Sequence, residues 1–324
     1  MAEITYLEAI RQGLWEEMER DASVFLLGED IAAFGGAFKL TAGFLEEFGE
    51  ARVIDTPLSE AAIMGASIGA ALMGRRPVAE MQFMDFISCG LDQLVQMAAK
   101  MHYRWGAPVP MVVRGPAGAG VHGGPFHSQS NEMWFVHTPG LKVVIPSTPY
   151  DAKGLIKAAV RDPNPVIFFE HKFLYRRIKA EVPAEDYTVP LGKAAVRRAG
   201  EDLTVITYGA MVWTALEAAE ALEKEGVSVE VVDLRTLVPY DKDTILSSVR
   251  KCNRVLLLHE DTRTGGMAGE LAAVIAEEAF GDLDAPVVRV TAPDTPVPFA
   301  PPLEEYFLPN AQKVIDAARK LLKY

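Results

Sequence analysis

Short runs of Val, Ile and Leu alternate along the chain with longer stretches in which apolar residues recur every three or four positions. The short runs have the length of buried strands, and the longer stretches have the period of helices. The alternation predicts an α/β fold with parallel sheets flanked by helices. In the first half, the predicted strands are 24–27, 53–54, 78–81, 111–113, 143–145 and 166–169. The predicted helices are 5–21, 41–48, 61–74, 83–103 and 149–161.

A second series of the same kind follows residues 179–190, a charged stretch with two prolines and no period that we interpret as a linker. The predicted strands here are 203–207, 229–232, 254–258 and 287–290, and the predicted helices are 211–225, 241–251, 267–280 and 310–322. A chain of 324 residues exceeds one comfortable core. We therefore expect two domains, 1–185 and 186–324, each with a mainly parallel sheet.

Composition narrows the class of protein. Hydrophobic residues make up 49% and charged residues 23%, as in ordinary globular proteins. A net charge of −12 argues against nucleic acid and anionic membranes as partners. The N-terminal residues lack the basic start and apolar stretch of a signal peptide, and the weakly polar stretch 61–74 is too short to cross a bilayer. We expect a soluble cytoplasmic protein.

Ligands of open parallel sheets bind at the carboxyl ends of the strands, so the loops 28–30, 55–60 and 115–130 are the first candidates. Glu60 stands directly before the predicted helix 61–74. A carboxylate there either caps the helix or is partly desolvated so that it can exchange protons near neutral pH. The residues alone leave both interpretations open.

The loop 115–130 contains the pattern GxGxxG at residues 118–123. A dinucleotide site requires a helix directly after this pattern and an acid at the end of the next strand, and neither is predicted here. A mobile glycine-rich loop of an active site is favoured. His127 in this loop is either a hydrogen-bond or proton donor to substrate or a solvated histidine, and the pattern does not decide between them.

The segment Glu80–Phe86 combines an acid, the amide of Gln82 and aromatic rings that include Phe86. This mixture suits a flat heteroaromatic ligand, whose faces pack on rings and whose edge bonds to an amide. The alternative is an amphipathic strand that leads into the next helix.

Several motifs, in the same order along the chain, resemble the beta subunit of the thiamine-diphosphate-dependent 2-oxo acid dehydrogenases. They are Gly28-Glu29-Asp30, Asp55-Thr56-Pro57-Leu58-Ser59-Glu60, Pro77-Val78-Ala79-Glu80-Met81-Gln82-Phe83, His127-Ser128-Gln129-Ser130, Pro146-Ser147-Thr148-Pro149-Tyr150-Asp151-Ala152-Lys153-Gly154-Leu155 and Asp233-Leu234-Arg235-Thr236-Leu237. This family forms the decarboxylating component of pyruvate, branched-chain and acetoin dehydrogenase complexes. The resemblance implies a pyrimidine-binding domain, a transketolase-like C-terminal domain and an α2β2 heterotetramer.

The resemblance also implies residue roles. Glu60 bonds to the pyrimidine ring of thiamine diphosphate and drives its tautomerisation, for which a raised pKa is suited. Leu58, Gln82 and Phe86 line the pyrimidine pocket, and Phe86 stands where many relatives carry tyrosine. His127 assists substrate binding and reductive acylation of a lipoyl group. Glu29 belongs to a polar channel between the two active sites of the tetramer.

Cofactors and partners follow from the same resemblance. The chain lacks the Gly-Asp-Gly motif that holds magnesium in thiamine enzymes, so the alpha subunit is expected to hold Mg²⁺ and the diphosphate. Some relatives bind potassium near the turn that carries Ala159, Asp162 and Asn164, although this turn also fits a simple helix end. The lipoyl-bearing acyltransferase core of the complex is the second expected partner.

Three alternatives remain beside a 2-oxo acid dehydrogenase. They are an acetoin-cleaving dehydrogenase of the same family, a nicotinamide-dependent oxidoreductase based on GxGxxG, and a non-catalytic assembly subunit. The family's substrates differ by a few methyl groups, worth about 1–3 kcal/mol each in a pocket, so the resemblance implies the reaction class rather than one substrate.

Overall fold

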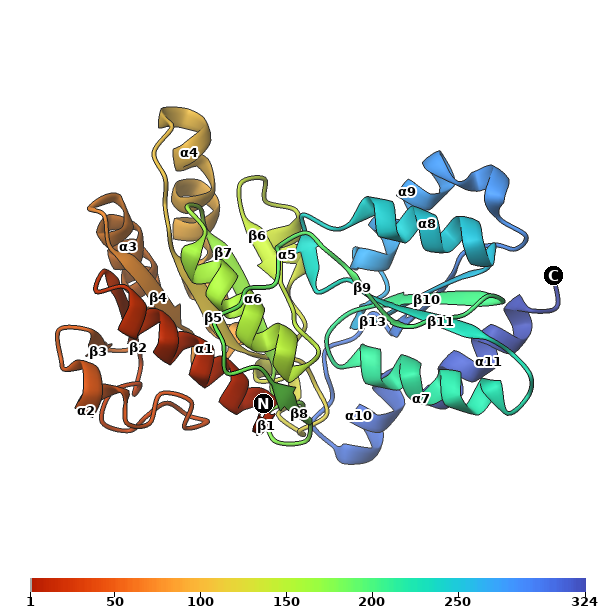
Figure 1. Ribbon diagram of the computed structural model, residues 1–324, viewed down its shortest axis with the longest axis horizontal. Coiled ribbons are helices and arrows are strands. Elements are labelled where there is room, and N and C mark those ends of the chain that lie inside the picture. The colour runs from red at the N-terminus through yellow and green to blue at the C-terminus, as the bar shows by residue number, and fades with distance from the viewer. Residues whose placement is uncertain (1) are drawn as a thin grey trace. The chain divides into compact units, whose positions relative to one another are not determined.

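The computed structural model describes residues 2–324, which divide into two compact units. The N-terminal unit contains the chain up to Ala117 together with Trp134–Leu191, and the C-terminal unit contains Gly118–Met133 together with Gly192–Tyr324. Both units are built from a sheet and helices, as the alternating pattern predicts (Figure 1). The sequence analysis places the domain boundary after residue 185, whereas the units change at residue 191 and the segment 118–133 belongs to the C-terminal unit.

The N-terminal unit contains a parallel sheet in the order β6-β7-β5-β4-β2-β3. Its strands are β2 (Val24–Gly28), β3 (Val53–Asp55), β4 (Arg76–Glu80), β5 (Val112–Ala117), β6 (Lys142–Val144) and β7 (Val166–His171). Its helices are α1 (Tyr6–Arg20), α2 (Phe44–Phe48), α3 (Glu60–Leu72), α4 (Ala99–Trp105) and α6 (Pro149–Arg161), and the short α5 spans Met133–Val136. All residues of β2, β5 and β7 are buried, as expected for strands covered on both faces.

Local side-chain chemistry explains where two of these helices begin. Thr5 caps α1 by accepting a 3.2 Å hydrogen bond from the Glu8 amide, and the Glu8 carboxylate accepts a 2.7 Å bond from the Thr5 amide. This reciprocal capping box satisfies two otherwise unpaired amides. Thr148 caps α6 in a similar way, with Pro149 in the first turn. The predicted helices at 5–21 and 149–161 are therefore confirmed.

The predicted helix 83–103 is not continuous. A 3₁₀ helix spans Met84–Gly90, a π-helical turn spans Gln93–Ala98, and only Ala99–Trp105 is α-helical. Gly90 lies so close to α3 that an added Cβ would stand 2.7 Å from Cγ of Met64. The interruption thus accompanies a close approach of two backbones, which an uninterrupted apolar period in the sequence does not reveal.

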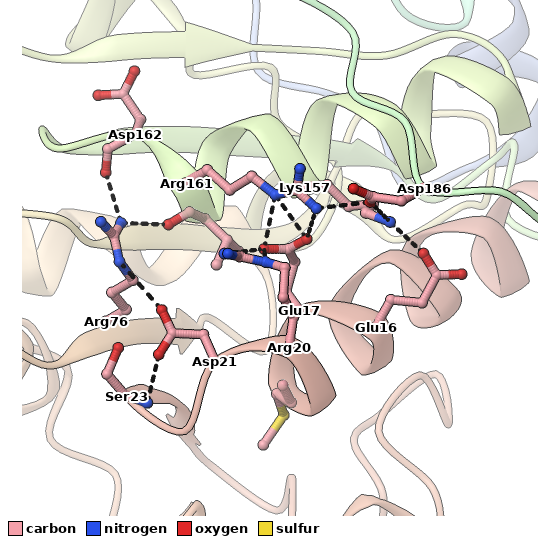
Figure 2. A network of polar contacts seen from close by, with 12 residues as sticks. Glu16, Glu17, Arg20, Asp21, Ser23, Arg76, Lys157, Arg161, Asp162 and Asp186 are labelled. Carbon is pink, nitrogen blue, oxygen red and sulfur yellow. Dashed lines mark hydrogen bonds and ion pairs between the residues drawn. The ribbon is translucent and has the colours of Figure 1, made fainter.

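The predicted linker 179–190 is partly a strand. Lys179–Val182 form β8, which pairs antiparallel with β1 (Ala2–Thr5). Asp186 then forms ion pairs with Lys157 at 2.6 Å and with Arg161 at 2.7 Å, both on α6 (Figure 2). The charges that made this segment resemble a linker belong to an edge strand and to ion pairs on the surface of the unit.

The C-terminal unit contains a five-stranded sheet in the order β14-β13-β10-β11-β9, in which only β9 is antiparallel to its neighbour. The strands are β9 (Ala195–Arg198), β10 (Leu203–Thr207), β11 (Val229–Asp233), β13 (Val255–Thr262) and β14 (Val288–Ala292), with the short β12 at Thr236–Val238. The helices are α7 (Met211–Glu223), α8 (Lys242–Cys252), α9 (Met267–Glu278), α10 (Pro301–Phe307) and α11 (Ala311–Leu321). The sequence analysis misses β9, β12 and α10, because all three are too short to show a period.

Residues 2–324 contain neither a membrane-spanning helix nor a metal-binding cluster of side chains. No helix there is long and apolar enough to span a membrane. No group of three or more His, Cys, Asp or Glu side chains there is arranged to hold a metal ion.

Candidate active site

The candidate residues of the N-terminal unit gather at one edge of its sheet. Gly28, at the end of β2, stands in register with Asp55 of β3 and Glu80 of β4. Because parallel strands end at the same edge, the loops that carry Glu29, Glu60 and Gln82 all start from this edge. The Thr56 amide also donates a 2.9 Å hydrogen bond to the Gly28 carbonyl, which ties two of these loops together.

Glu60 is the first residue of α3 and is half-buried. The residue before it, Ser59, occupies the cap position but makes no side-chain capping bond. The Glu60 carboxylate forms no hydrogen bond with any other residue in the range 2–324, and the helix start favours its negative charge. The sequence left open whether this carboxylate caps the helix. It forms no capping bond, and it is therefore available to bond to a ligand.

Glu29 is brought beside Glu60 and is 6% exposed. Burial raises the pKa of Glu29, and the negative charges of Glu60 and Asp30 raise it further. Asp30 adopts a left-handed backbone with φ 56° and accepts a 3.3 Å hydrogen bond from the Gln82 side-chain amide. Three of the predicted site residues, Glu29, Glu60 and Gln82, therefore belong to one polar cluster.

An aromatic group and an exposed leucine complete this edge. Phe86 lies on the 3₁₀ helix, half-buried, with its ring edge-on to that of Phe83 at 6.1 Å between centroids. Leu58 is 80% exposed. An apolar side chain this exposed next to a polar cluster is the kind of surface that a ligand or a second chain covers.

Beneath this edge lies an ionic network that sequence reasoning missed. The Arg114 guanidinium on β5 pairs with Glu80 on β4 and with Glu170 on β7, and the Tyr175 hydroxyl donates a 2.6 Å bond to Glu170. Burial raises the pKa of Glu80 and opposes the charge of Arg114, yet the two carboxylates together keep the pKa of Arg114 well above its usual range. The sequence signal that could have indicated this network is the single charged residue within each of several apolar strands. Buried charges require partners, so such residues are expected to pair.

His127 belongs to the C-terminal unit through the segment 118–133. It is half-buried at the end of a short 3₁₀ turn, Gly124–Phe126, and its amide donates a 3.3 Å bond to the Gly124 carbonyl. The neighbouring Ser128 is 1% exposed, and its hydroxyl has no partner among residues 2–324. The 3₁₀ turn stands where a dinucleotide site requires a full helix, which counts against the nicotinamide interpretation.

A second buried polar group lies in the C-terminal unit. The Tyr208 hydroxyl donates a 2.7 Å bond to Glu132, and the Tyr208 ring stacks on His259 at 6.2 Å between centroids. Burial, then the charge of Asp261, raises the pKa of Glu132. Burial lowers the pKa of His259 to about 4, so this histidine is neutral at physiological pH. These positions carried no recognisable motif in the sequence.

The candidate potassium residues lie at the end of α6. The Asp162 carboxylate pairs with Lys142 at 2.5 Å and accepts a 2.8 Å hydrogen bond from the backbone amide of Asn164. The Ala159 carbonyl accepts a bond of 3.2 Å from the Asp162 amide. The side-chain oxygen of Asn164 is buried without a partner among residues 2–324. One oxygen of this group is thus available to a ligand, while the carboxylate already has a cation.

Comparison with known proteins defines the class of this chain. Residues 2–177 match the transketolase pyrimidine-binding domain and residues 192–314 match the transketolase C-terminal domain. A solved structure described as a split gene transketolase, an inactive beta4 tetramer, superposes with a TM-score of 0.81 at 23% identity, covering 99% of this chain and 98% of that one. The chain therefore has the two-domain transketolase-like fold.

Relatives that match over nearly their whole length show to which family the chain belongs. The chain is 55% identical to the 2-oxoisovalerate dehydrogenase subunit beta of Bacillus subtilis and 48% identical to the pyruvate dehydrogenase E1 component subunit beta of the same organism, with complete coverage of all three sequences. It is 46% identical to the acetoin:2,6-dichlorophenolindophenol oxidoreductase subunit beta of Cupriavidus necator, over 97% of this chain and 96% of that one. The chain belongs to the family of beta subunits of thiamine-diphosphate-dependent 2-oxo acid dehydrogenases, which are oxidoreductases.

Proposed function

We propose that this chain, together with an alpha subunit, catalyses the oxidative decarboxylation of a 2-oxo acid with thiamine diphosphate and transfers the acyl group to a lipoyl domain. The observation that carries the proposal is Glu60, a half-buried carboxylate at a strand-end edge that has no hydrogen-bond partner among residues 2–324. Such a carboxylate fits a ring nitrogen with which it can share a proton. When bound at this edge, thiamine diphosphate would supply a carbon nucleophile and an electron sink for the decarboxylation.

The residues of this edge have separate tasks. Glu60 holds the proton shared with the pyrimidine ring, and the half-buried ring of Phe86 packs against that flat ligand. The amide of Gln82, which bonds to Asp30, presents hydrogen-bonding groups to its edge. Glu29, whose pKa burial raises, accepts or returns a proton beside Glu60 and belongs to a polar channel between two active sites.

His127, in the C-terminal unit, acts on substrate and on the acyl acceptor. An imidazole can donate a hydrogen bond or a proton, which suits contact with a substrate carboxylate or with a lipoyl sulfur. Its position on a glycine-rich loop, rather than inside the sheet, suits contact with a group carried by another protein.

The chain's partners follow from what it lacks. No Gly-Asp-Gly sequence occurs, so the alpha subunit holds Mg²⁺ and the diphosphate. The exposed Leu58 stands two positions before Glu60 in the sequence and is the side chain that the alpha subunit or the cofactor covers in an α2β2 heterotetramer. The lipoyl-bearing acyltransferase core is the second partner.

Potassium bound at the end of α6 is part of the proposal, supported by the buried side-chain oxygen of Asn164, which has no hydrogen-bond partner in the range 2–324. Exchange of potassium for tetramethylammonium is expected to lower the melting temperature of the heterotetramer, and Asn164→Ala is expected to abolish this difference. Equal melting temperatures of the unmodified protein in both salts would show that the turn needs no potassium.

The test uses the chain co-expressed with its alpha subunit, with decarboxylation followed through an artificial electron acceptor. Glu60→Gln is expected to lower kcat by at least about 100-fold while the heterotetramer still assembles, because a positioned proton carrier contributes about 10²–10⁴ in rate. Glu46→Gln is the matched control, since Glu46 is an exposed acid in the first turn of α2 in the same unit.

The result also separates the alternative functions. A Glu60→Gln heterotetramer with an unchanged rate would favour a non-catalytic assembly subunit. A rise in melting temperature with NADH would favour a nicotinamide enzyme, and we expect none.

The substrate is identified by comparing kcat/KM for pyruvate, branched-chain 2-oxo acids and acetoin with the same preparation. A preference for acetoin would assign the acetoin-cleaving reaction. We expect a 2-oxo acid to be preferred.

A further inference from the structure

The loop that carries His127 is closed at its base. The Gly118 amide donates a 3.1 Å hydrogen bond to the Gln129 carbonyl. The buried carboxylate of Glu260, on β13, accepts a bond of 3.2 Å from the Ala119 amide and one of 3.0 Å from the Ser130 hydroxyl. Residues 118–130 thus form a compact loop whose two ends are joined, as in Ω-loops.

A second carboxylate, that of Glu304, contacts the loop at a point farther from its base. Glu304, on α10, is 1% exposed. It accepts a 3.0 Å hydrogen bond from the Gly120 amide and a 3.1 Å hydrogen bond from the His122 amide, and its Oε2 lies 2.6 Å from Nδ1 of His122. Among residues 2–324, all hydrogen bonds to this carboxylate come from the loop, so its burial is compensated by the loop alone.

The backbone that Glu304 holds is one that a free chain would avoid. His122 has a left-handed conformation with φ 59°, and Gly120 and Gly124 on either side have φ 87° and 68°. A histidine in this region is strained and persists only where surrounding contacts impose it. The hydrogen bond that Glu304 accepts from the His122 amide and its close contact with the His122 ring are such contacts.

The same stretch of chain touches the loop a second time, closer to His127. An added Cβ on Gly124 would stand 2.8 Å from Cδ2 of Phe299, so the aromatic ring lies directly against the loop backbone. Phe299 and Glu304 are five positions apart. The loop is therefore contacted by this stretch of chain at 120–122 and again at 124.

We propose that Glu304 is a positioning residue for His127: by fixing residues 120–122 in a strained backbone, it sets where the loop presents that imidazole. This inference rests on the function proposed above for His127. Glu304 itself exchanges no proton with substrate in this scheme; its effect passes through the loop.

The first measurement is independent of catalysis. Amide hydrogen exchange of a peptide covering 118–130 is compared, in the assembled heterotetramer, between the unmodified protein, Glu304→Ala, Glu304→Gln and Glu305→Gln. We expect roughly tenfold faster exchange in Glu304→Ala, a smaller increase in Glu304→Gln, which keeps the volume and one acceptor, and none in Glu305→Gln. Glu305 is the matched control because it is the next residue of α10 and is exposed.

The second measurement is the reductive acylation of a free lipoyl domain. Glu304→Ala is expected to lower kcat/KM roughly tenfold, since small displacements of a catalytic group have effects of this size or larger. Glu304→Gln is expected to retain most of the rate. Glu304→Ala combined with His127→Ala is expected to be no slower than His127→Ala alone, because the position of an absent imidazole cannot matter.

The outcomes are distinguishable. Unchanged exchange in Glu304→Ala would overturn the inference, as would an additive loss in the double variant. A His127→Ala enzyme with unmodified acylation would instead overturn the role proposed for His127, and the inference with it, without any variant of Glu304.

Discussion

The Tyr208 hydroxyl donates a 2.7 Å hydrogen bond to Oε1 of Glu132 in the interior of the C-terminal unit. Burial, with a contribution from the charge of Asp261, raises the pKa of this carboxyl. Burial of Tyr208, followed by the charge of Glu132, likewise raises the pKa of the phenol. Both groups therefore favour their neutral forms, and the pair acts as a neutral hydrogen bond inside the core.

We predict that ionisation of Glu132 lowers the free energy of unfolding as pH rises. A folded-state pKa above the unfolded value means that the native state binds the extra proton, so this contribution is complete below the ordinary glutamate pKa of about 4.3 and is lost as pH rises through the raised value. Glu132→Gln keeps an oxygen acceptor for Tyr208 and does not titrate. The free energy of unfolding of Glu132→Gln, measured in urea between about pH 5 and about pH 9, is expected to fall less steeply than that of the unmodified protein.

The control for this pH series is Glu220→Gln, at an exposed position of α7 in the same unit. It should follow the unmodified protein throughout. Parallel curves for Glu132→Gln and the unmodified protein would show that Glu132 does not carry the proton.

Arg114 is expected to contribute strongly to the N-terminal unit. Arg114→Met leaves Glu80 and Glu170 buried without their cation, and loss of one partner of a buried ion pair lowers stability by about 3–5 kcal/mol. Chemical denaturation of the purified variant measures the loss. Lys100→Met, which removes an exposed lysine that bonds to Gln96, should change the free energy of unfolding by less than about 1 kcal/mol. Similar losses in the two variants would refute this ranking.

Two carboxylates of one network should differ in importance because their burial differs (Figure 2). Glu17 has no exposed side-chain surface and pairs with Arg161 at 2.6 Å, whereas Asp186 is 61% exposed and pairs with the same arginine at 2.7 Å. Glu17→Gln is expected to lower the free energy of unfolding by roughly 3 kcal/mol. Asp186→Asn should lower it by less than about 1 kcal/mol, and an equal effect of both would contradict the dependence on burial.

The charge of Glu60 acts on its neighbour in the candidate active site. Burial raises the pKa of Glu29 first, and the negative charge of Glu60 adds to it. Glu60→Gln should therefore lower the pKa of Glu29 while leaving it above the ordinary value. The titration of the Glu29 carboxyl carbon, followed by ¹³C NMR and assigned with Glu29→Gln, measures this shift. Glu46→Gln should leave it in place, and an unmoved titration in Glu60→Gln would exclude the interaction.

Local and periodic features of the fold were predictable from the sequence. The start of α1 follows from Thr5 and Glu8, whose capping box involves neighbouring residues only. The gathering of Glu29, Glu60 and Gln82 follows from the shared edge of parallel strands, which needs no knowledge of side-chain packing. The roles proposed for them came from the family resemblance rather than from spacing.

Features that depend on distant partners were not predictable. Segment 118–133 belongs to the C-terminal unit, where its amides donate hydrogen bonds to Glu260 and Glu304. No local sequence pattern predicts those bonds. Strand β8 was mistaken for a linker because edge strands carry charges for the same reason that linkers do, namely contact with water. Arg114 was missed because its partners lie on neighbouring strands rather than beside it in sequence.

The separation along the chain between the His127 loop and its two carboxylates has a consequence for synthesis. The acceptor for the Ala119 amide, Glu260, is synthesised 141 positions later, and the acceptor for the Gly120 amide, Glu304, is synthesised 184 positions later. On the ribosome the sheet of the N-terminal unit can assemble while this loop still has nothing to bind. A nascent chain that ends between residues 261 and 303 therefore has the carboxylate that closes the base of the loop but lacks the one that holds residues 120–122.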